Sequence, residues 1–128
     1  MATQVQPHFD QKSQLDRIKA YLLPSENLFA VYDCKGGGTG FVGITDRRVI
    51  FYDQAFLTKK KSMVSIPYNN IIGVAAADEG MILQTSEITI LTAAGNYTFQ
   101  FRGADKAHAA YRYILSQILS QADPQLPG

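Results

Sequence analysis

The stretch from Thr39 to Asp53 reads TGFVGITDRRVIFYD, with two short apolar runs on either side of Asp46-Arg47. A two-residue loop at this position predicts an antiparallel hairpin in which Gly43 lies opposite Ile50. The hairpin decides the fold class, because it commits the centre of the chain to antiparallel β-structure and supplies much of an apolar core.

The predicted hairpin has two faces of different character, because alternate residues of a strand point to opposite sides. The wholly apolar face holds Val42, Ile44, Val49 and Phe51. The other face holds Phe41, Gly43, Ile50 and Tyr52, with Arg48 near the turn. This second face needs a cover, either a sheet or helix of the same chain or another subunit. Phe41, Ile50 and Tyr52 are therefore candidate interface residues. A longer loop would shift the register and exchange the two faces.

Composition indicates one ordinary globular domain. The chain has 128 residues, 46% hydrophobic and 18% charged, which suffices for a buried core. A net charge of +1 provides no general attraction for nucleic acid, and none is expected as a partner. The lone Cys34 excludes an intrachain disulfide and fits a reducing cytoplasm, the expected location. Neither a signal-peptide pattern nor a membrane-spanning apolar run is found in the sequence.

A short helix is predicted near the N-terminus, after a flexible leader at residues 1–9. Asp10 or Ser13 can cap it, and Pro24 closes it. Its apolar stripe consists of Leu15, Ile18 and Leu22. A helix of this kind is expected to lie on the outside of a sheet.

The other strands are predicted at Leu28–Lys35, Ser62–Ile66, Ile72–Ala77, Glu87–Thr92 and Tyr97–Arg102, with a partly extended segment at Met81–Thr85. Predicted breaks are the glycine turn Gly36–Gly38, the loop Gln54–Lys60 and Asp78–Gly80. A turn at Ala94-Gly95 or at Gly95-Asn96 places the apolar residues of the last two strands on one face.

A long C-terminal helix follows the last strand, at Lys106–Gln121 with Asp105 as its cap. Its apolar stripe contains Ala107, Tyr111, Ile114, Leu115, Ile118 and Leu119, a pattern typical of a helix that packs on a sheet. The predicted order is one helix, about seven strands and one helix. The domain spans residues 10–121, and residues 122–128 form a flexible tail.

Several segments resemble a known family. They are Glu26-Asn27-Leu28, Gly43–Phe51 (GITDRRVIF), Ser65–Ile71 (SIPYNNI) and Tyr97–Phe101 (YTFQF). With the order of elements, they resemble the bacterial pleckstrin-homology-like (PH-like) domains over roughly residues 12–120. The resemblance implies a strongly bent antiparallel sheet or open barrel, mainly β with α, in which the last helix closes one end.

The family takes its name from modules that can bind phosphoinositides through basic residues on the first two strands and the loop between them. Lys35 matches the first-strand position, but Thr39–Ile44 contains no Lys or Arg. The tryptophan usual in the helix of those modules is also missing. Bacterial members that resemble this chain are mostly of unknown role, and some look like assembly modules.

A candidate anion or lipid site consists of four lysines: Lys35, Lys59, Lys60 and Lys61. If the strands alternate in direction, these lysines share one end and could attract anionic head groups. Asp78 and Glu79 are expected at the same end and would offset part of the charge. The alternative is a solvated lysine run that keeps a loop soluble.

Catalytic, metal and cofactor sites are not predicted. His8 and His108 lack neighbouring ligands in sequence, and such chemistry needs convergent partners. Cys34 adjoins Lys35, which could lower the thiol pKa, although an inert, half-buried thiol is the favoured interpretation. Arg47 and Arg48 are expected to pair with Asp46 or Asp53, with a bidentate anion site as the alternative. Tyr111 and Tyr113 are expected in the core and at its rim.

The leading functional hypothesis is a non-catalytic interaction module that binds a protein partner or assembles as a homo-oligomer. The alternative is weak binding of anionic lipid head groups or of other anions through Lys35, Lys59, Lys60 and Lys61. Lipid binding of this kind would be a peripheral contact with the membrane. A small-molecule carrier that uses the barrel mouth has no support beyond the fold.

Overall fold

The computed structural model describes residues 6–34, 40–53, 62–77 and 86–122. Within these ranges the chain forms eight strands in two sheets, two α-helices and a short 3-10 helix. Several predicted segments lie outside the described residues. They are the glycine turn, the loop at Gln54–Lys60, the break at Asp78–Gly80, the extended segment at Met81–Thr85 and all but the first residue of the C-terminal tail.

The first sheet contains β1 (His8–Phe9), β2 (Leu28–Asp33), β3 (Phe41–Thr45), β4 (Arg48–Asp53) and β5 (Ser62–Pro67), in that order. β1 runs parallel to β2, and the other neighbours are antiparallel. Residues 8–9 were expected in the flexible leader and instead pair with β2. The backbone N–H of Asp10 continues this contact by donating to the carbonyl oxygen of Val31 at 3.2 Å.

The central hairpin has the predicted register. Gly43 lies opposite Ile50, and the pairs on either side also match. The side chain of Thr45 holds the turn, because its hydroxyl oxygen accepts the backbone N–H groups of Arg47 and Arg48, each at 3.0 Å. A local polar side chain thus satisfies the donors that a tight turn leaves unpaired.

The second sheet contains β6 (Ile71–Ala76), β7 (Glu87–Thr92) and β8 (Gly95–Gln100), in that order. The turn between β7 and β8 lies at residues 93–94, earlier than predicted, because Thr92 pairs with Gly95. Gly95 has a φ of 147°, which favours glycine. The shift moves the register by an even number of residues, so the predicted inner face of Ile88, Ile90 and Phe99 is retained and buried.

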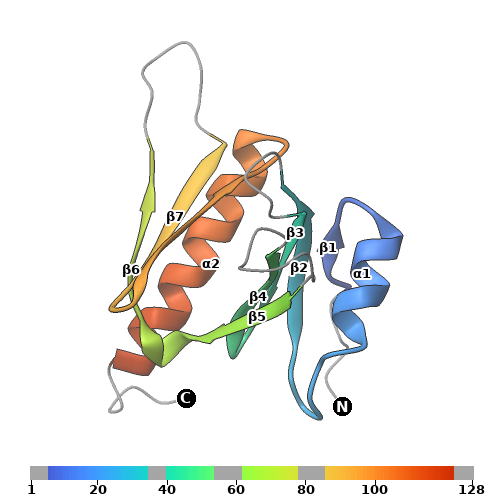
Figure 1. Cartoon of the computed structure of the whole chain (residues 1–128), viewed down its shortest axis with the longest axis horizontal. Coiled ribbons are helices and arrows are strands. Elements are labelled where there is room, and N and C mark those ends of the chain that lie inside the picture. Colours follow the sequence, from blue (N-terminus) through green and yellow to red (C-terminus); the bar gives the residue numbers. More distant parts are fainter. Residues whose placement is uncertain (1–5, 35–39, 54–61, 78–85, 123–128) are drawn as a thin grey trace.

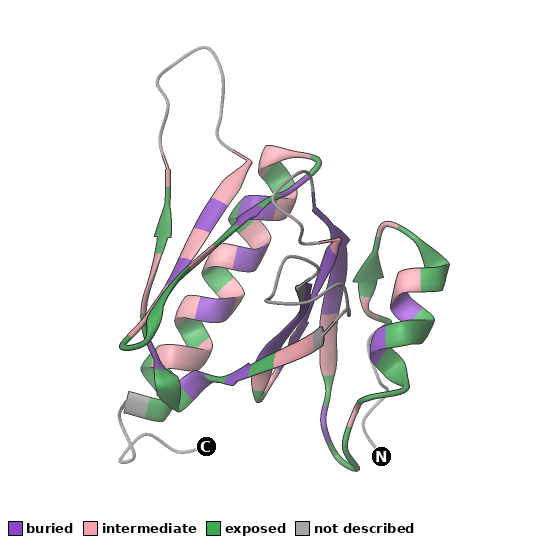
Figure 2. Cartoon of the chain, viewed as in Figure 1, coloured by how far each residue is buried: buried purple, intermediate pink, exposed green. Residues whose placement is uncertain are grey.

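The main core lies between the two sheets and α2 (Ala104–Ala122). Figure 1 shows α2 between β6–β7 on one side and the first sheet on the other, and Figure 2 shows buried segments on α2 and on strands of both sheets. The helix begins before the predicted cap Asp105, because the N–H of Ala107 already bonds to the carbonyl of Gly103 at 3.2 Å. Asp105 instead lies in the first turn, where an acidic side chain favours the helix dipole.

The inner face of α2 differs in part from the predicted stripe. Ala107, Ala110 and Ile114 are fully buried, and Tyr111 and Ile118 pack against the core. Leu119, which was predicted to face the core, is 56% exposed. It lies next to Ile118, which packs against the core, but outside the helix face that is turned toward the core.

The short 3-10 helix η1 (Tyr68–Asn70) connects the two sheets and contacts α2. Tyr68 is almost fully buried, and its hydroxyl donates to the carbonyl oxygen of Thr45 at 2.6 Å. This bond ties the connection to the turn of the central hairpin.

A second, smaller core lies on the outer side of the first sheet, beneath α1 (Lys12–Lys19). Leu15 and Ile18 are buried there, as predicted. Neither expected cap serves the helix: Gln11 occupies the N-cap position without a side-chain bond. The helix already ends at Lys19, with Ala20 as C-cap, so Pro24 does not terminate it.

Candidate functional site

The candidate interface residues Phe41, Ile50 and Tyr52 lie beneath α1 of the same chain. Their exposed fractions are 9%, 0% and 8%. Arg17 fastens the helix over them, because its Nη1 donates to the hydroxyl of Tyr52 at 2.7 Å and its guanidinium lies 5.3 Å from the ring centre. Helix α1 of the same chain thus covers this face, and a partner could contact these residues only if α1 were displaced from the sheet.

The candidate lysines Lys35, Lys59, Lys60 and Lys61 lie outside the described residues. The structure therefore does not place them relative to one another or to the acidic residues Asp78 and Glu79, which are also outside it. Anion binding by this set remains a prediction from the sequence.

The described part of the chain contains a dense polar cluster where the loop of residues 20–27 meets the central hairpin. We call this loop the tip loop and the side chains of Glu26, Thr45 and Arg48 the tip clamp. Arg48 binds Glu26 with two parallel bonds, Nε to Oε2 at 2.8 Å and Nη2 to Oε1 at 2.9 Å. The hydroxyl of Thr45 donates to Glu26 Oε2 at 2.7 Å.

The tip clamp also holds the backbone of the tip loop. Glu26 Oε1 accepts the backbone N–H of Leu23 at 3.0 Å, and Arg48 Nη2 donates to the carbonyl oxygen of Tyr21 at 2.7 Å. Arg48 Nη1 donates to the hydroxyl of Ser65 on β5 at 3.0 Å. One arginine thus joins the tip loop to two strands.

The partner of Arg48 corrects the sequence prediction, which named Asp46 or Asp53. Asp46 instead accepts the backbone and side-chain N–H groups of Asn27, both at 3.0 Å. Burial by itself would raise the pKa of Glu26. The bonds from Arg48, the N–H of Leu23 and Thr45 outweigh burial and lower the pKa to about 2.

A second polar cluster lies at the other end of β2, and we call its residues Asp10, Asp33, Arg102 and Lys106 the base clamp. Arg102 Nε bonds to Asp33 Oδ2 at 2.7 Å, and Lys106 pairs with Asp10. Asp10 Oδ2 also accepts the backbone N–H of Asp33 at 2.8 Å. Asp10 is therefore a tertiary link between β1, β2 and α2 rather than a helix cap. Gln14 Nε2 adds a bond to Asp33 Oδ1 at 2.8 Å.

Cys34 and the histidines form no reactive arrangement in the described structure. Cys34 is buried, and its burial, with Asp33 and Asp10 nearby, raises the thiol pKa to about 12. The lowered pKa considered from the sequence is therefore wrong. His8 packs edge-on against Phe29, which stacks on Tyr113 at a centroid distance of 4.2 Å. Among the described residues, no group of three or more His, Cys, Asp or Glu side chains could hold a metal ion.

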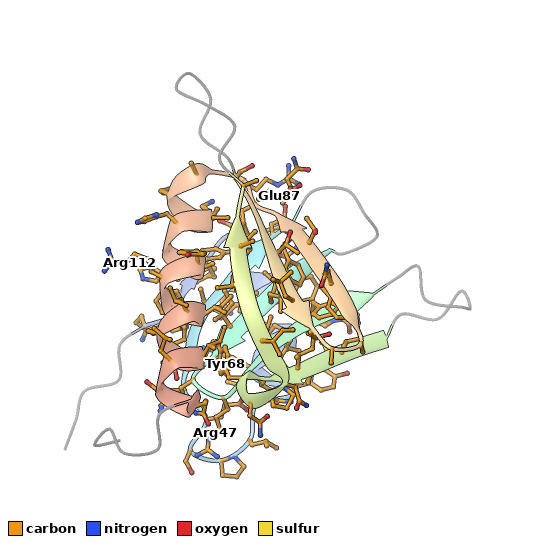
Figure 3. The ribbon with its side chains drawn as sticks, turned by 90° about the vertical axis from the view of Figure 1, so that its left-hand side faces the viewer. Arg47, Tyr68, Glu87 and Arg112 are labelled. Carbon is orange, nitrogen blue, oxygen red and sulfur yellow. The ribbon has the colours of Figure 1, made fainter. Side chains whose placement is uncertain are left out.

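Two strongly exposed apolar side chains lie on neighbouring elements, Ile72 on β6 (71%) and Leu119 on α2 (56%). The beginning of β6 runs beside the C-terminal turns of α2 in both views of the fold (Figures 1 and 3). We call these two residues the edge patch. β6 is an edge strand of its three-stranded sheet and contains no charged residue.

The sequence analysis missed the tip clamp and the edge patch. Glu26 and Arg48 stand 22 positions apart, and no local pattern couples a loop glutamate to a strand arginine. Ile72 was assigned to a strand, but its exposure depends on the register shift between Ile71 and Gly73. A bulge of this kind turns a side chain out of the expected alternation.

None of the helices in the described ranges is long and apolar enough to cross a membrane.

Comparisons with known proteins identify relatives of the chain. Residues 9–122 match the family model of the GRAM domain. The uncharacterized protein YozO of Bacillus subtilis (strain 168) is 26% identical over 85 residues, which cover 66% of this chain and 72% of YozO.

Two solved bacterial structures share the fold. The pleckstrin homology domain from Shewanella amazonensis SB2B has a TM-score of 0.62 at 22% identity and covers 86% of this chain and 99% of its own. A DUF1696 family protein with a pleckstrin-homology domain from Shewanella loihica PV-4 has a TM-score of 0.62 at 17% identity, with coverages of 88% and 96%. The predicted PH-like fold, mainly β with a helix at each end, is confirmed.

Proposed function

The chain belongs to the GRAM domain family, and from this premise we propose that it is a non-catalytic interaction module that binds a protein partner, in the first place a second copy of itself. The observation that carries the proposal is the edge patch. Ile72 and Leu119 are both more than half exposed. Exposed large apolar side chains on neighbouring elements favour association, because contact with a partner removes them from water.

The position of the edge patch suits a docking surface. Unprotected edge strands carry free backbone donors and acceptors that another chain can pair with, and proteins usually protect them with charged residues or proline. β6, with the sequence IIGVAA, has neither. A partner at this edge would combine backbone pairing along β6 with burial of Ile72 and Leu119.

The experiment is to measure the mass of the protein in solution by analytical ultracentrifugation over a wide concentration range. We expect self-association in the wild type and a monomer for Ile72→Asp, because a carboxylate at the contact would have to be desolvated. Asn96→Asp is the matched control, since Asn96 is exposed on β8, the opposite edge strand of the same sheet. A wild type that stays monomeric at all concentrations, or equal effects of both variants, would refute self-association through this edge.

The second candidate function is binding of anionic lipid head groups or other anions through Lys35, Lys59, Lys60 and Lys61. Its support is the clustering of lysines in the sequence, each worth about 1 kcal/mol close to a charged surface. Co-sedimentation with anionic vesicles should then be lost at high salt and in the triple variant Lys59→Ala, Lys60→Ala, Lys61→Ala. Vesicle binding that the triple variant retains would exclude this lysine run.

A further inference from the structure

The tip loop exposes two large apolar side chains. Tyr21 is 49% exposed and Leu23 is 59% exposed, while Leu22 between them packs into the core beneath α1. The loop lies at one end of the molecule, beside the turn of the central hairpin that carries Arg47 (Figures 1 and 3). A bond from the N–H of Asp46 to the carbonyl of Asn27 at 2.9 Å joins the two segments.

The exposure of these side chains belongs to a fixed loop conformation. The N–H of Glu26 bonds to the carbonyl of Leu23 at 3.1 Å, and the carboxylate of Glu26 accepts the N–H of Leu23 in return. Pro24 and Ser25 occupy the two central positions of this turn, and Ser25 has a φ of 67°. Proline followed by a residue of positive φ is typical of a type II turn. These hydrogen bonds thus hold Leu23 in its exposed position.

Two basic residues adjoin the apolar tip. Lys19 ends α1 two positions before Tyr21, and Arg47 lies on the adjacent hairpin turn. Among the described residues, no acidic side chain pairs with Lys19 or Arg47. Of the acidic residues around the loop, Asp16 forms a salt bridge with Lys12 and Glu26 forms one with Arg48. Asp46 is the remaining acidic residue there, and it has no salt bridge to a described residue.

We propose that the tip loop docks on the surface of an anionic lipid membrane, with Tyr21 and Leu23 entering the interfacial region and Lys19 and Arg47 facing the lipid phosphates. Membrane-surface segments combine aromatic and aliphatic side chains with flanking Lys or Arg in this way. A protein interface typically buries roughly 1,200–2,000 Å². Unlike the edge patch, which adjoins an edge strand whose backbone can also pair with a partner, the tip loop offers a protein only two apolar side chains, and these suffice to anchor a loop that charge also attracts to a membrane.

The test uses a tryptophan reporter. The chain contains no tryptophan, so Leu23→Trp introduces a single one at the tip, and His108→Trp introduces a single one at an exposed site on α2 that belongs to neither proposed surface. Fluorescence is recorded with vesicles of phosphatidylcholine and with vesicles of equimolar phosphatidylcholine and phosphatidylglycerol. We expect a blue shift for Leu23→Trp with the anionic vesicles alone, and none for His108→Trp. An absent shift, or equal shifts for both variants, would overturn the proposal.

Co-sedimentation with the same vesicles measures the contributions of single residues. Leu23→Ser should weaken binding about tenfold, and Lys19→Gln and Arg47→Gln about fivefold each. Arg112→Gln is the matched charge control, because Arg112 is exposed on α2 and lies well away from Arg47 in Figure 3. Binding that Leu23→Ser leaves unchanged would overturn the proposal, as would a loss in Arg112→Gln equal to that in Arg47→Gln.

This membrane surface shares no residue with the edge patch or with the set of four candidate lysines. Leu23→Ser should leave self-association unchanged, and Ile72→Asp should leave vesicle binding unchanged. Vesicle binding that is lost in the triple lysine variant but retained in Leu23→Ser would assign the membrane contact to the lysines instead. The failure of one proposal is thus distinguishable from the failure of the other.

Discussion

The two clamps lie near opposite ends of β2, where they fasten the N-terminal segment to the rest of the fold, and they differ in how exposed their side chains are to water. In the tip clamp, the side chain of Glu26 has no exposed surface and that of Arg48 is 17% exposed. In the base clamp, the side chain of Arg102 is 50% exposed. A buried charge that loses its partner stays unsatisfied, whereas an exposed charge is solvated by water. An ion pair at the tip clamp is therefore expected to contribute more to the free energy of unfolding than one at the base clamp.

The largest effect is expected for Arg48→Met. The substitution keeps much of the side-chain volume but leaves the carboxylate of Glu26 buried without its cation. We expect the free energy of unfolding to fall by about 3–5 kcal/mol in urea titrations. Arg47→Met, at an exposed neighbouring arginine, should change it by less than about 0.5 kcal/mol. Similar values for the two variants would show that the tip clamp is no more stabilising than a surface contact.

Acid should weaken the tip clamp selectively. The pKa of Glu26 falls from 4.5 to about 2 on folding, so its stabilisation is complete above pH 4.5 and is lost as the pH falls toward 2. The shift corresponds to about 3 kcal/mol. Urea titrations across this window should show a steeper loss of stability for the wild type than for Glu26→Gln, which does not titrate. Parallel curves would assign the acid sensitivity to other carboxylates.

Between the two clamps, the packing of α1 against the first sheet depends on Gly43. A Cβ atom at this position would lie 2.9 Å from Cγ2 of Ile18, which is fully buried. Gly43→Ala should therefore cost about 1–3 kcal/mol of unfolding free energy through overpacking. Gly40→Ala is the control, because a Cβ there meets no atom within 4 Å. An equal and small effect at both positions would mean that α1 shifts freely on the sheet.

The smallest effect is expected at the base clamp. Arg102→Gln removes a half-exposed cation, and the remaining Asp33 carboxylate, 11% exposed, keeps the bond from Gln14, so we expect a loss of about 0–1 kcal/mol that shrinks with added salt. The readout is urea unfolding at low and high ionic strength. A loss as large as that of Arg48→Met would remove the distinction between the clamps.

The clamps also mark where sequence reasoning failed. Asp10 has the residue type of a helix cap and lies just before a helix, yet it binds Lys106 and the backbone of Asp33. Arg48 has acidic neighbours in sequence, yet it binds Glu26. Rules based on sequence neighbours consider only partners that are close along the chain, whereas the folded chain pairs these two charges with residues that are distant in sequence. Both misassignments concern polar residues whose partners are remote.

The sequence by itself determined the strands β2–β8 in their order along the chain, the register of the central hairpin and the family, but it missed β1. The alternation of apolar residues with period two fixes which residues share a face. The predicted faces of β7 and β8 were correct although the turn between them was misplaced, because the register shift was an even number of residues. The tertiary structure alone decided that α1 covers Phe41, Ile50 and Tyr52, and that Tyr21, Leu23 and Ile72 stay exposed. Burial depends on which elements pack together in three dimensions, and the periodicity of the sequence does not specify which elements those are.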